Sequence, residues 1–267
     1  MDIPIESVAS SFLEISSEQR LNILINLKEK ETTITGMAKI LDATVPEVHR
    51  NFTRLVKVGL IEKNNDGTHR LTEYGKVVCF QLPTIAFMSK NKKYFQGHNF
   101  GDLPPKFMQR IGTLSNSKII NGYVKVSEKW NDIYKNAEKF IHNVLVEVSY
   151  DPELMKILQE KMKKKIPISS VFSDNAIITK GRKKSITEKD LKEFVEDNVL
   201  RRRMKKDVTV SVILNEKEAG ICFPTPEEAD LGKMFYSSDP QFHEFCMDYF
   251  EYCWQKSGRF QEDKLRE

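Results

Sequence analysis

Four side chains in the stretch TVPEVHRNFTRLVK, residues 44–57, can form directional hydrogen bonds with flat chemical edges: His49, Arg50, Asn51 and Arg54. An arginine can donate two hydrogen bonds to a guanine edge, an asparagine can pair with an adenine edge, and a threonine can contact the thymine methyl group. This stretch therefore carries the chemistry needed to distinguish DNA bases. The polar positions expected on its exposed face are Thr44, Glu47, His49, Arg50, Asn51, Thr53, Arg54 and Lys57.

A second group of polar and basic residues follows in LIEKNNDGTHRLT. Two short strands flank Asn65-Asp66-Gly67, which predicts a hairpin because such a turn requires positive φ. Side chains of this kind suit contacts to phosphates, which fix the position of a protein on DNA. The residues expected to make these contacts are Lys63, Asn64, Asn65, His69 and Arg70.

An apolar stripe must hold the first group in place. Val45, Val48, Phe52 and Leu55 recur at helical spacing, so we expect one face of a helix of about fourteen residues, roughly 20 Å long, to be buried. Thr44 can cap the helix, Pro46 falls in its first turn, and Gly59 ends it.

The flanking sequence predicts helices on both sides of this unit. Three helical patterns precede it, and Thr72 with Glu73 begins a long helix that reaches about Lys90 and contains Pro83. Helices followed by a two-stranded hairpin constitute a winged helix-turn-helix. The apolar positions of the three preceding helices are Ile5, Val8, Phe12 and Ile15; Leu21, Leu24, Ile25 and Leu27; and Met37, Ile40 and Leu41.

Downstream of Tyr94 the pattern alternates between strands and helices, which favours a sheet covered by helices. We expect strands in KIINGYVKV, NVLVEVS, IPISSVF, VLRRRMK, VTVSVILN and EAGICFP, and a helix between Trp130 and Phe140. Three further helices are expected: DPELMKILQEKMKKK with Asp151 as cap, ITEKDLKEFVEDN with Thr187 as cap, and DPQFHEFCMDYFEYCWQKSG, in which Cys246 and Cys253 share one face and are expected to be buried. The predicted fold class is α+β, an N-terminal winged helix-turn-helix followed by an α/β sheet domain. The predicted boundaries are 1–72 for the winged helix, 73–94 for a linking or dimerisation helix, and 95–267 for an effector or sensory domain.

Several motifs resemble a known family. TVPEVHRNFTRLVKVGLI and HRLTEYGKVV are similar to the ArsR-type winged-helix regulators of archaea. GHNFGDLPPKFMQRIGTL and EKEAGICFPTPEEADLGKMFYSSDPQFHEFCMDYFEYCW resemble the effector domain of the archaeal methanogenesis regulatory proteins, although the tryptophan typical after the DP pair is replaced by Phe245 or a neighbour. The resemblance implies a dimeric transcription regulator whose base contacts come from Pro46, His49, Arg50, Asn51 and Arg54, with a wing contact from Arg70.

Four polar residues of the second half are candidates for binding a small effector: His98, Asp102, Asp230 and Tyr236. A carboxylate beside aromatic rings suits a small ligand in a mostly apolar pocket. The competing interpretation is that these groups only cap helices and stabilise loops.

The residues give no comparable support for an enzyme, a metal site or a cofactor. The second half resembles half of a phospholipase D-like fold, but His142 and His98 lack the lysine two residues later that such enzymes use. No GxGxxG, Walker or HExxH motif occurs, and no histidine has zinc-ligand spacing. We therefore expect no catalysis, no metal and no cofactor.

Composition is that of an intracellular globular protein. The chain has 267 residues, 40% hydrophobic and 30% charged, with a net charge of +4. Its four cysteines form no CxxC pair, and no apolar run is long enough to cross a bilayer, so we expect a cytoplasmic protein. Three basic runs, 161–165, 182–184 and 201–206, could contact nucleic acid, but a solvated surface is the favoured interpretation.

The sequence therefore predicts a sequence-specific DNA-binding transcription regulator that contacts double-stranded DNA as a homodimer and responds to a small-molecule effector. Dimerisation is expected because two-fold operators match two-fold proteins. The alternative is a winged helix that contacts protein instead of DNA.

Overall fold

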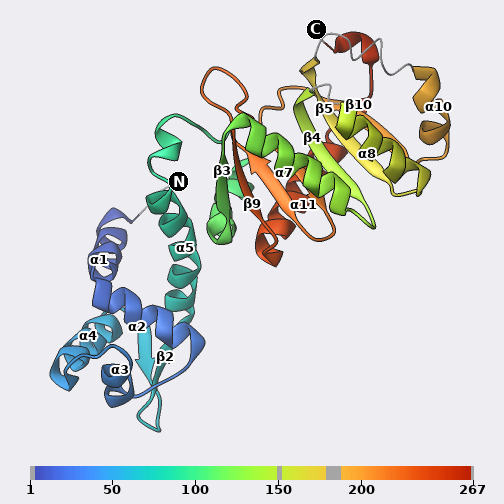
Figure 1. The fold of residues 1–267 in the computed structure, drawn as a ribbon. Helices are drawn as coiled ribbons and strands as arrows, with labels where there is room; N and C mark the ends of the chain where they lie inside the picture. Colours follow the sequence, from blue (N-terminus) through green and yellow to red (C-terminus); the bar gives the residue numbers. More distant parts are fainter. Residues whose placement is uncertain (1–3, 149–151, 179–187, 266–267) are drawn as a thin grey trace. The chain divides into compact units, whose positions relative to one another are not determined.

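A computed structural model describes residues 4–148, 152–178 and 188–265 (Figure 1). The chain divides into two compact units, Met1–Pro83 and Thr84–Glu267.

The N-terminal unit is a winged helix-turn-helix. Helices α1 to α4 are followed by a two-stranded antiparallel hairpin, in which Glu62 pairs with Arg70, and then by α5. Helix α5 begins in this unit and its residues from Thr84 belong to the second. The elements are α1 (Ile5–Ile15), α2 (Glu18–Glu29), α3 (Ile34–Ile40), α4 (Val45–Lys57), β1 (Ile61–Lys63), β2 (His69–Leu71) and α5 (Glu73–Lys90).

Local signals explain where these elements begin and end. Ser17 caps α2 by accepting a hydrogen bond from the backbone N–H of Arg20, and Thr33 caps α3 in the same way. Gly59 follows α4 with φ of 73°, and Gly67 closes the hairpin with φ of 85°. Both values lie in the left-handed region that favours glycine, so the predicted helix end and turn are confirmed.

The core of this unit packs α4 against α2, α3 and the hairpin. Val48, Phe52 and Leu55 of α4 are buried, as predicted. Val45 and Ile40 were also expected in the core, but they are 45% and 56% exposed. Each lies on its helix beside the buried positions, where no described element of this unit covers it. The buried face of α2 also differs from the predicted one: Ile23, which was not predicted to be buried, is buried, and Ile25, which was in the predicted apolar set, is 49% exposed.

Helix α1 departs most from expectation. Its apolar stripe was expected to pack inward, yet Ile5 is 74%, Val8 37% and Phe12 53% exposed. Only Ile15, at the end of α1, packs against the core of the unit. The apolar side of α1 is thus a surface within this unit.

The C-terminal unit contains an eight-stranded mixed sheet in the order β10-β6-β5-β4-β7-β8-β9-β3. Strands β4, β5 and β6 pair in parallel, and the other pairings are antiparallel. The strands are β3 (Lys118–Asn121), β4 (Ile141–Val148), β5 (Ile168–Ile178), β6 (Leu200–Lys205), β7 (Ser211–Asn215), β8 (Ala219–Cys222), β9 (Lys233–Ser237) and β10 (Gly258–Arg259). The helical elements are η1 (Tyr94–Gln96), α6 (Pro105–Met108), η2 (Ile111–Asn116), α7 (Tyr123–Asn136), α8 (Pro152–Lys163), α10 (Glu188–Glu196), α11 (Pro240–Gln255) and η3 (Glu262–Lys264).

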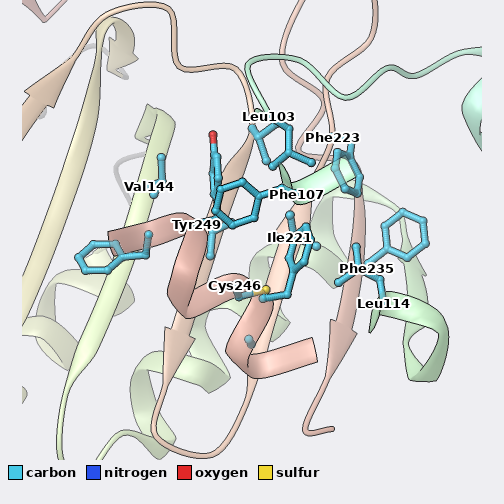
Figure 2. Close-up of a cluster of buried hydrophobic side chains, with 14 of the residues drawn as sticks. Leu103, Phe107, Leu114, Val144, Ile221, Phe223, Phe235, Cys246 and Tyr249 are labelled. Carbon is cyan, nitrogen blue, oxygen red and sulfur yellow. The ribbon is translucent and has the colours of Figure 1, made fainter. Parts of the chain in front are cut away.

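Helices cover both faces of this sheet. Alternate residues of β4 face opposite sides: Val144 packs with α11, whereas Ile141 packs with α7 and α8 (Figure 1). Figure 2 shows Cys246 and Tyr249 of α11 gathered with Phe107 and Ile221 in the larger core. Cys246 and Cys253 are both fully buried, so the expected burial of the α11 cysteines is confirmed.

Two predictions for this unit were wrong. Strand β3 ends at Asn121 and α7 begins at Tyr123, because Gly122 turns the chain with φ of 104° between them. Strand β9 (Lys233–Ser237) was not predicted. The expected caps at Asp151 and Thr187 lie outside the described residues.

Candidate nucleic-acid interface

Helix α4 starts with a reciprocal cap. The backbone N–H of Thr44 donates to Glu47 Oε2 at 3.1 Å, and that of Glu47 donates to Thr44 Oγ1 at 3.4 Å. Pro46 occupies the first turn, where a missing N–H costs no hydrogen bond. Thr44 Oγ1 and Glu47 Oε2 are thus both used in capping hydrogen bonds at the start of α4. A base contact by either residue stays a prediction.

One face of α4 is exposed and positively charged. It comprises Pro46, His49, Arg50, Thr53 and Lys57, spaced at i, i+3, i+4, i+7 and i+11. Neither Arg50 nor Lys57 forms an ion pair with a residue that the structure describes. The cations of this face are therefore available to an outside anion or a base edge.

Asn51 does not belong to this exposed face. The sequence placed it among the base-contacting residues, but it is 6% exposed. Its Nδ2 donates to Gln19 Oε1, and its Oδ1 accepts from Arg20 Nη1 at 3.5 Å. The start of α2 covers Asn51, because the helix turn that carries it faces α2 and not solvent.

Arg54 is half exposed but already paired. Its Nε and Nη2 each lie 2.8 Å from the Glu14 carboxylate, a bidentate ion pair between α4 and α1. Glu14 also lies 3.5 Å from Arg20 Nε, and its own side chain is 12% exposed. The hydrogen bond from Arg54 lowers the pKa of Glu14 below its ordinary value, in spite of burial. Arg54, Glu14 and Arg20 thus fix how α4 sits on α1 and α2.

The wing offers fewer free groups than the sequence suggested. Arg70 donates to Glu62 at 2.7 Å across the hairpin, with both side chains about half exposed. Lys63 and Asn65 are exposed, while Asn64 donates to Glu31 and Thr68. Lys63 and Asn65 are therefore the wing positions best placed for phosphate contacts.

His69 was predicted to be a wing contact, and its location corrects this. It is 4% exposed and its ring meets Phe52 edge-on, with centroids 4.7 Å apart. The backbone of β2 at His69 also pairs with Thr32, which turns the side chain towards α4. Burial, with smaller contributions from Lys63 and His49, lowers the pKa of His69, so its neutral form is favoured.

The four effector candidates are distributed over three places. His98 Nε2 lies 2.8 Å from Asp230 Oδ2, and the imidazole stacks on Tyr94 at 3.9 Å. These two candidates therefore meet, though 132 positions separate them in the chain.

Asp102 lies in a separate polar cluster. It accepts hydrogen bonds from the backbone of Thr209 at 3.0 Å and from the Tyr249 hydroxyl at 2.9 Å, and it pairs with Lys205 at 2.9 Å. Burial opposes ionisation, but the hydrogen bonds from Thr209 and Lys205 outweigh it, so the pKa of Asp102 is lowered. These contacts match the loop-stabilising interpretation.

Tyr236 lies elsewhere and donates to Glu218 Oε2. Burial and this hydrogen bond raise the pKa of Tyr236, so it stays a neutral donor. Of the four candidates, the structure therefore brings together only His98 and Asp230.

Both described basic runs contain residues engaged in structural contacts, although Lys163, Lys164 and Lys165 are exposed. Lys161 Nζ donates to the carbonyls of Lys135 and Ala137 at 2.6 and 2.7 Å, so it caps the end of α7 and not of its own helix. On β6, Arg202 pairs with Glu262 at 3.2 Å, and Arg203 donates to the Trp254 carbonyl. The run at 182–184 lies outside the described residues.

Sequence inspection missed Glu14 and Arg20 as positioning residues. The one available signal was that Glu14 is a charged residue in a mostly apolar helical segment, where a carboxylate needs a partner. Within the described part of the chain, no group of three His, Cys, Asp or Glu side chains could hold a metal ion. Nor does any helix there have the length and apolar character needed to span a membrane.

Comparison with known proteins gives one match by sequence. A family described as HVO_A0114 matches residues 15–78, from the end of α1 into α5, which is less than half of the chain. No curated protein matches the chain.

Three solved structures show a low overall likeness. TrmBL2, an archaeal chromatin protein whose structure is described as showing a novel mode of DNA binding, is 10% identical, with 91% of this chain and 94% of that chain covered and a TM-score of 0.36. Nuc, a phospholipase D family member from Salmonella typhimurium, is 10% identical, with 55% and 100% covered and a TM-score of 0.36. IdeR from T. acidophilum is 12% identical, with 84% and 98% covered and a TM-score of 0.24. Likenesses at these TM-scores support no functional conclusion.

Proposed function

We propose that this chain is a sequence-specific DNA-binding transcription regulator. The observation that carries the proposal is the exposed face of α4, where His49, Arg50 and Lys57 project from a helix whose opposite face is buried. A winged helix-turn-helix presents such a helix to the major groove. Arg50 is the residue proposed to contact guanine, because its guanidinium has no competing carboxylate among the described residues.

The dimensions support insertion of α4. Its 13 residues span about 20 Å, and the major groove is about 12 Å wide and admits one helix. The hairpin follows α4 directly, so Lys63 and Asn65 can contact phosphates while α4 contacts bases. Arg70 can join them only by leaving Glu62.

We further propose that the regulator is a homodimer. Exposed apolar groups lie on α1 and on the first half of α5, which are neighbours because Tyr74 Oη donates to Ser11 Oγ at 2.6 Å. Phe12 is 53%, Val77 57% and Phe80 66% exposed. A surface of this kind on two adjacent helices suits an isologous contact with a second copy of the chain. Two copies would double the number of base pairs contacted.

The C-terminal unit is proposed to be a sensory domain that responds to a small-molecule effector. Support for this role, for the ArsR type and for an archaeal regulator of the methanogenesis-regulatory kind comes from the sequence motifs. Any such effector must bind one arrangement of the contacting helices more tightly than another.

The test is selection of binding sites from random double-stranded DNA with the full chain, followed by affinity measurements at several salt concentrations. Affinity should fall steeply with salt, because Lys and Arg contacts release counterions. Arg50→Ala should cost about 1–3 kcal/mol and blur preference at one base.

Lys28→Ala is the matched control. Lys28 is a cation of the same unit, but it lies on α2 over the ring of Phe80, away from the α4 face. It should leave base preference unchanged. Failure to enrich any sequence, or an Arg50→Ala variant with unaltered base preference, would contradict the proposal. Binding of a protein with little salt dependence would favour the protein-contacting alternative.

A further inference from the structure

A small cavity lies inside the C-terminal unit, between helices α7, α8 and α10 and the face of β4, β5 and β6 that they cover. Its volume is about 130 Å³. Most of its wall is apolar. Six of the large side chains in this wall are Trp130, Tyr134, Leu145, Leu154, Leu158 and Phe172. None of the four effector candidates taken from the sequence lines it.

One polar group in this wall lacks a partner. Asn143 is 1% exposed, and its Nδ2 donates to the Tyr134 hydroxyl at 3.0 Å. Its Oδ1 accepts no hydrogen bond from any described residue. Strand β4 pairs with β5 on one side and β7 on the other, so the backbone of Asn143 is held within the sheet. A buried acceptor without a donor is costly, and an aliphatic side chain of similar size would avoid that cost.

The charged groups at this cavity argue against an anionic ligand. Arg202 lines the cavity, but its guanidinium pairs with Glu262 at 3.2 Å and packs on the ring of Phe260 at 4.4 Å. Glu147, two residues beyond Leu145 on the same face of β4, adds a carboxylate to the wall. Burial, and secondly the charge of Glu228, raise the pKa of Glu147, as expected for a poorly hydrated site.

We propose that this cavity binds a neutral, single-ring aromatic molecule or one of similar size, whose one hydroxyl or amine donates a hydrogen bond to Asn143 Oδ1. The size fits, because an apolar cavity of about 150 Å³ is known to hold benzene. Trp130 and Phe172 supply flat walls for a ring, and Asn143 supplies the directional contact that discriminates between ligands. The identification of this cavity as the effector site of the regulator rests on the function proposed above, whereas the proposed binding of the aromatic molecule does not.

The test uses phenol and toluene, which have the same number of heavy atoms but differ in the hydroxyl donor. Binding to the full chain is measured by calorimetry and by NMR without DNA, so that its outcome is separate from that of the DNA experiments. Phenol should bind about fivefold to tenfold more tightly than toluene, the effect of one buried hydrogen bond. Asn143→Leu should abolish this preference.

A second variant keeps the test decisive if Asn143→Leu does not fold. Leu158→Trp places a larger ring in the cavity and should abolish binding of both probes. Lys156→Trp is its control, because Lys156 is an exposed residue of the same helix that does not line the cavity. Absence of phenol binding, equal binding of phenol and toluene, or phenol binding that survives Leu158→Trp would each overturn the proposal.

Discussion

Replacing Glu14 by glutamine tests whether the ion pairs of α1 position the DNA-contacting helix. The substitution keeps the size of the side chain but removes the charge that Arg54 contacts with two hydrogen bonds of 2.8 Å. It also removes the carboxylate 3.5 Å from Arg20, whose side chain is 10% exposed. We expect Glu14→Gln to destabilise the N-terminal unit.

The magnitude follows from how far each partner can be rehydrated. Hydrogen bonds to charged groups contribute about 1.5–3 kcal/mol, but Arg54 is 47% exposed, so water replaces much of what it loses. Arg20 is buried and keeps the backbone carbonyls of Glu14 and Leu13 and the side-chain oxygen of Asn51 as partners, but it loses the charge of the Glu14 carboxylate. A loss of about 2 kcal/mol in the free energy of unfolding is therefore expected, most of it from Arg20.

Urea unfolding with two probes measures this effect. Both tryptophans of the chain, Trp130 and Trp254, lie in the C-terminal unit, so their fluorescence follows that unit, whereas far-UV circular dichroism follows both. Glu14→Gln should shift the dichroism transition to lower urea and leave the fluorescence transition in place.

The control is Glu73→Gln, which breaks the exposed pair between Glu73 and Lys76. It should stay within about 0.5 kcal/mol of the unsubstituted chain. If Glu14→Gln is as mild as Glu73→Gln, the network does not hold α4, and the explanation for the orientation of α4 is wrong.

Three further predictions concern single residues. Asn51→Ala should lower the stability of the N-terminal unit by about 1–2 kcal/mol without altering the preferred bases, as urea unfolding and site selection would show; a changed base preference would restore Asn51 as a contact. Burial lowers the pKa of His142 from 6.5 to about 4, so on acidification the unfolded chain binds a proton at this residue at a higher pH than the folded chain does. The contribution of neutral His142 to the free energy of unfolding is therefore complete above pH 6.5 and is lost as the pH falls towards 4. His142→Gln should flatten this dependence in unfolding curves followed by tryptophan fluorescence, and an unchanged slope would exclude His142 as its cause. Phe80→Glu should yield monomers in sedimentation experiments if α1 and α5 form the dimer contact, and a persistent dimer would place that contact elsewhere.

Signals confined to a few neighbouring residues were enough to predict the N-terminal fold. The cap at Thr44, the end of α4 at Gly59 and the turn at Gly67 each depend on local backbone chemistry, and all three are present. Burial at Asn51 and His69 could not be inferred in that way. It depends on Arg20 and Thr32, which lie more than a helix away in the chain and approach only after folding.

The sites of the C-terminal unit were still harder to anticipate. His98 and Asp230 meet across 132 positions, and nothing in either local sequence indicates the other. The walls of the cavity come from three helices and three strands, and each residue by itself resembles an ordinary core residue. Asn143, the third residue of β4 (IHNVLVEV), has no local signature either. It stands out only because its Oδ1 is buried and has no partner among the described residues.

Arg50 and Arg54 are one helical turn apart on α4, yet their surroundings assign them different tasks. A guanidinium that already holds a carboxylate through two hydrogen bonds must release it before it can hold a guanine edge in the same way. The base contact gains about 1–3 kcal/mol, and the release would leave Glu14 and Arg20 without part of their network, so little net gain remains. Base discrimination should therefore fall to Arg50, while Arg54 keeps α4 fixed to α1. Because α1 also carries exposed Phe12, the same ion pair links the proposed base contacts to the proposed dimer surface. In such a dimer, the ion pair between Glu14 and Arg54 would set the separation of the two α4 helices, because it joins each α4 to the α1 at the dimer contact. A half-site spacing of about one helical turn of DNA would then depend on α1 as well as on α4.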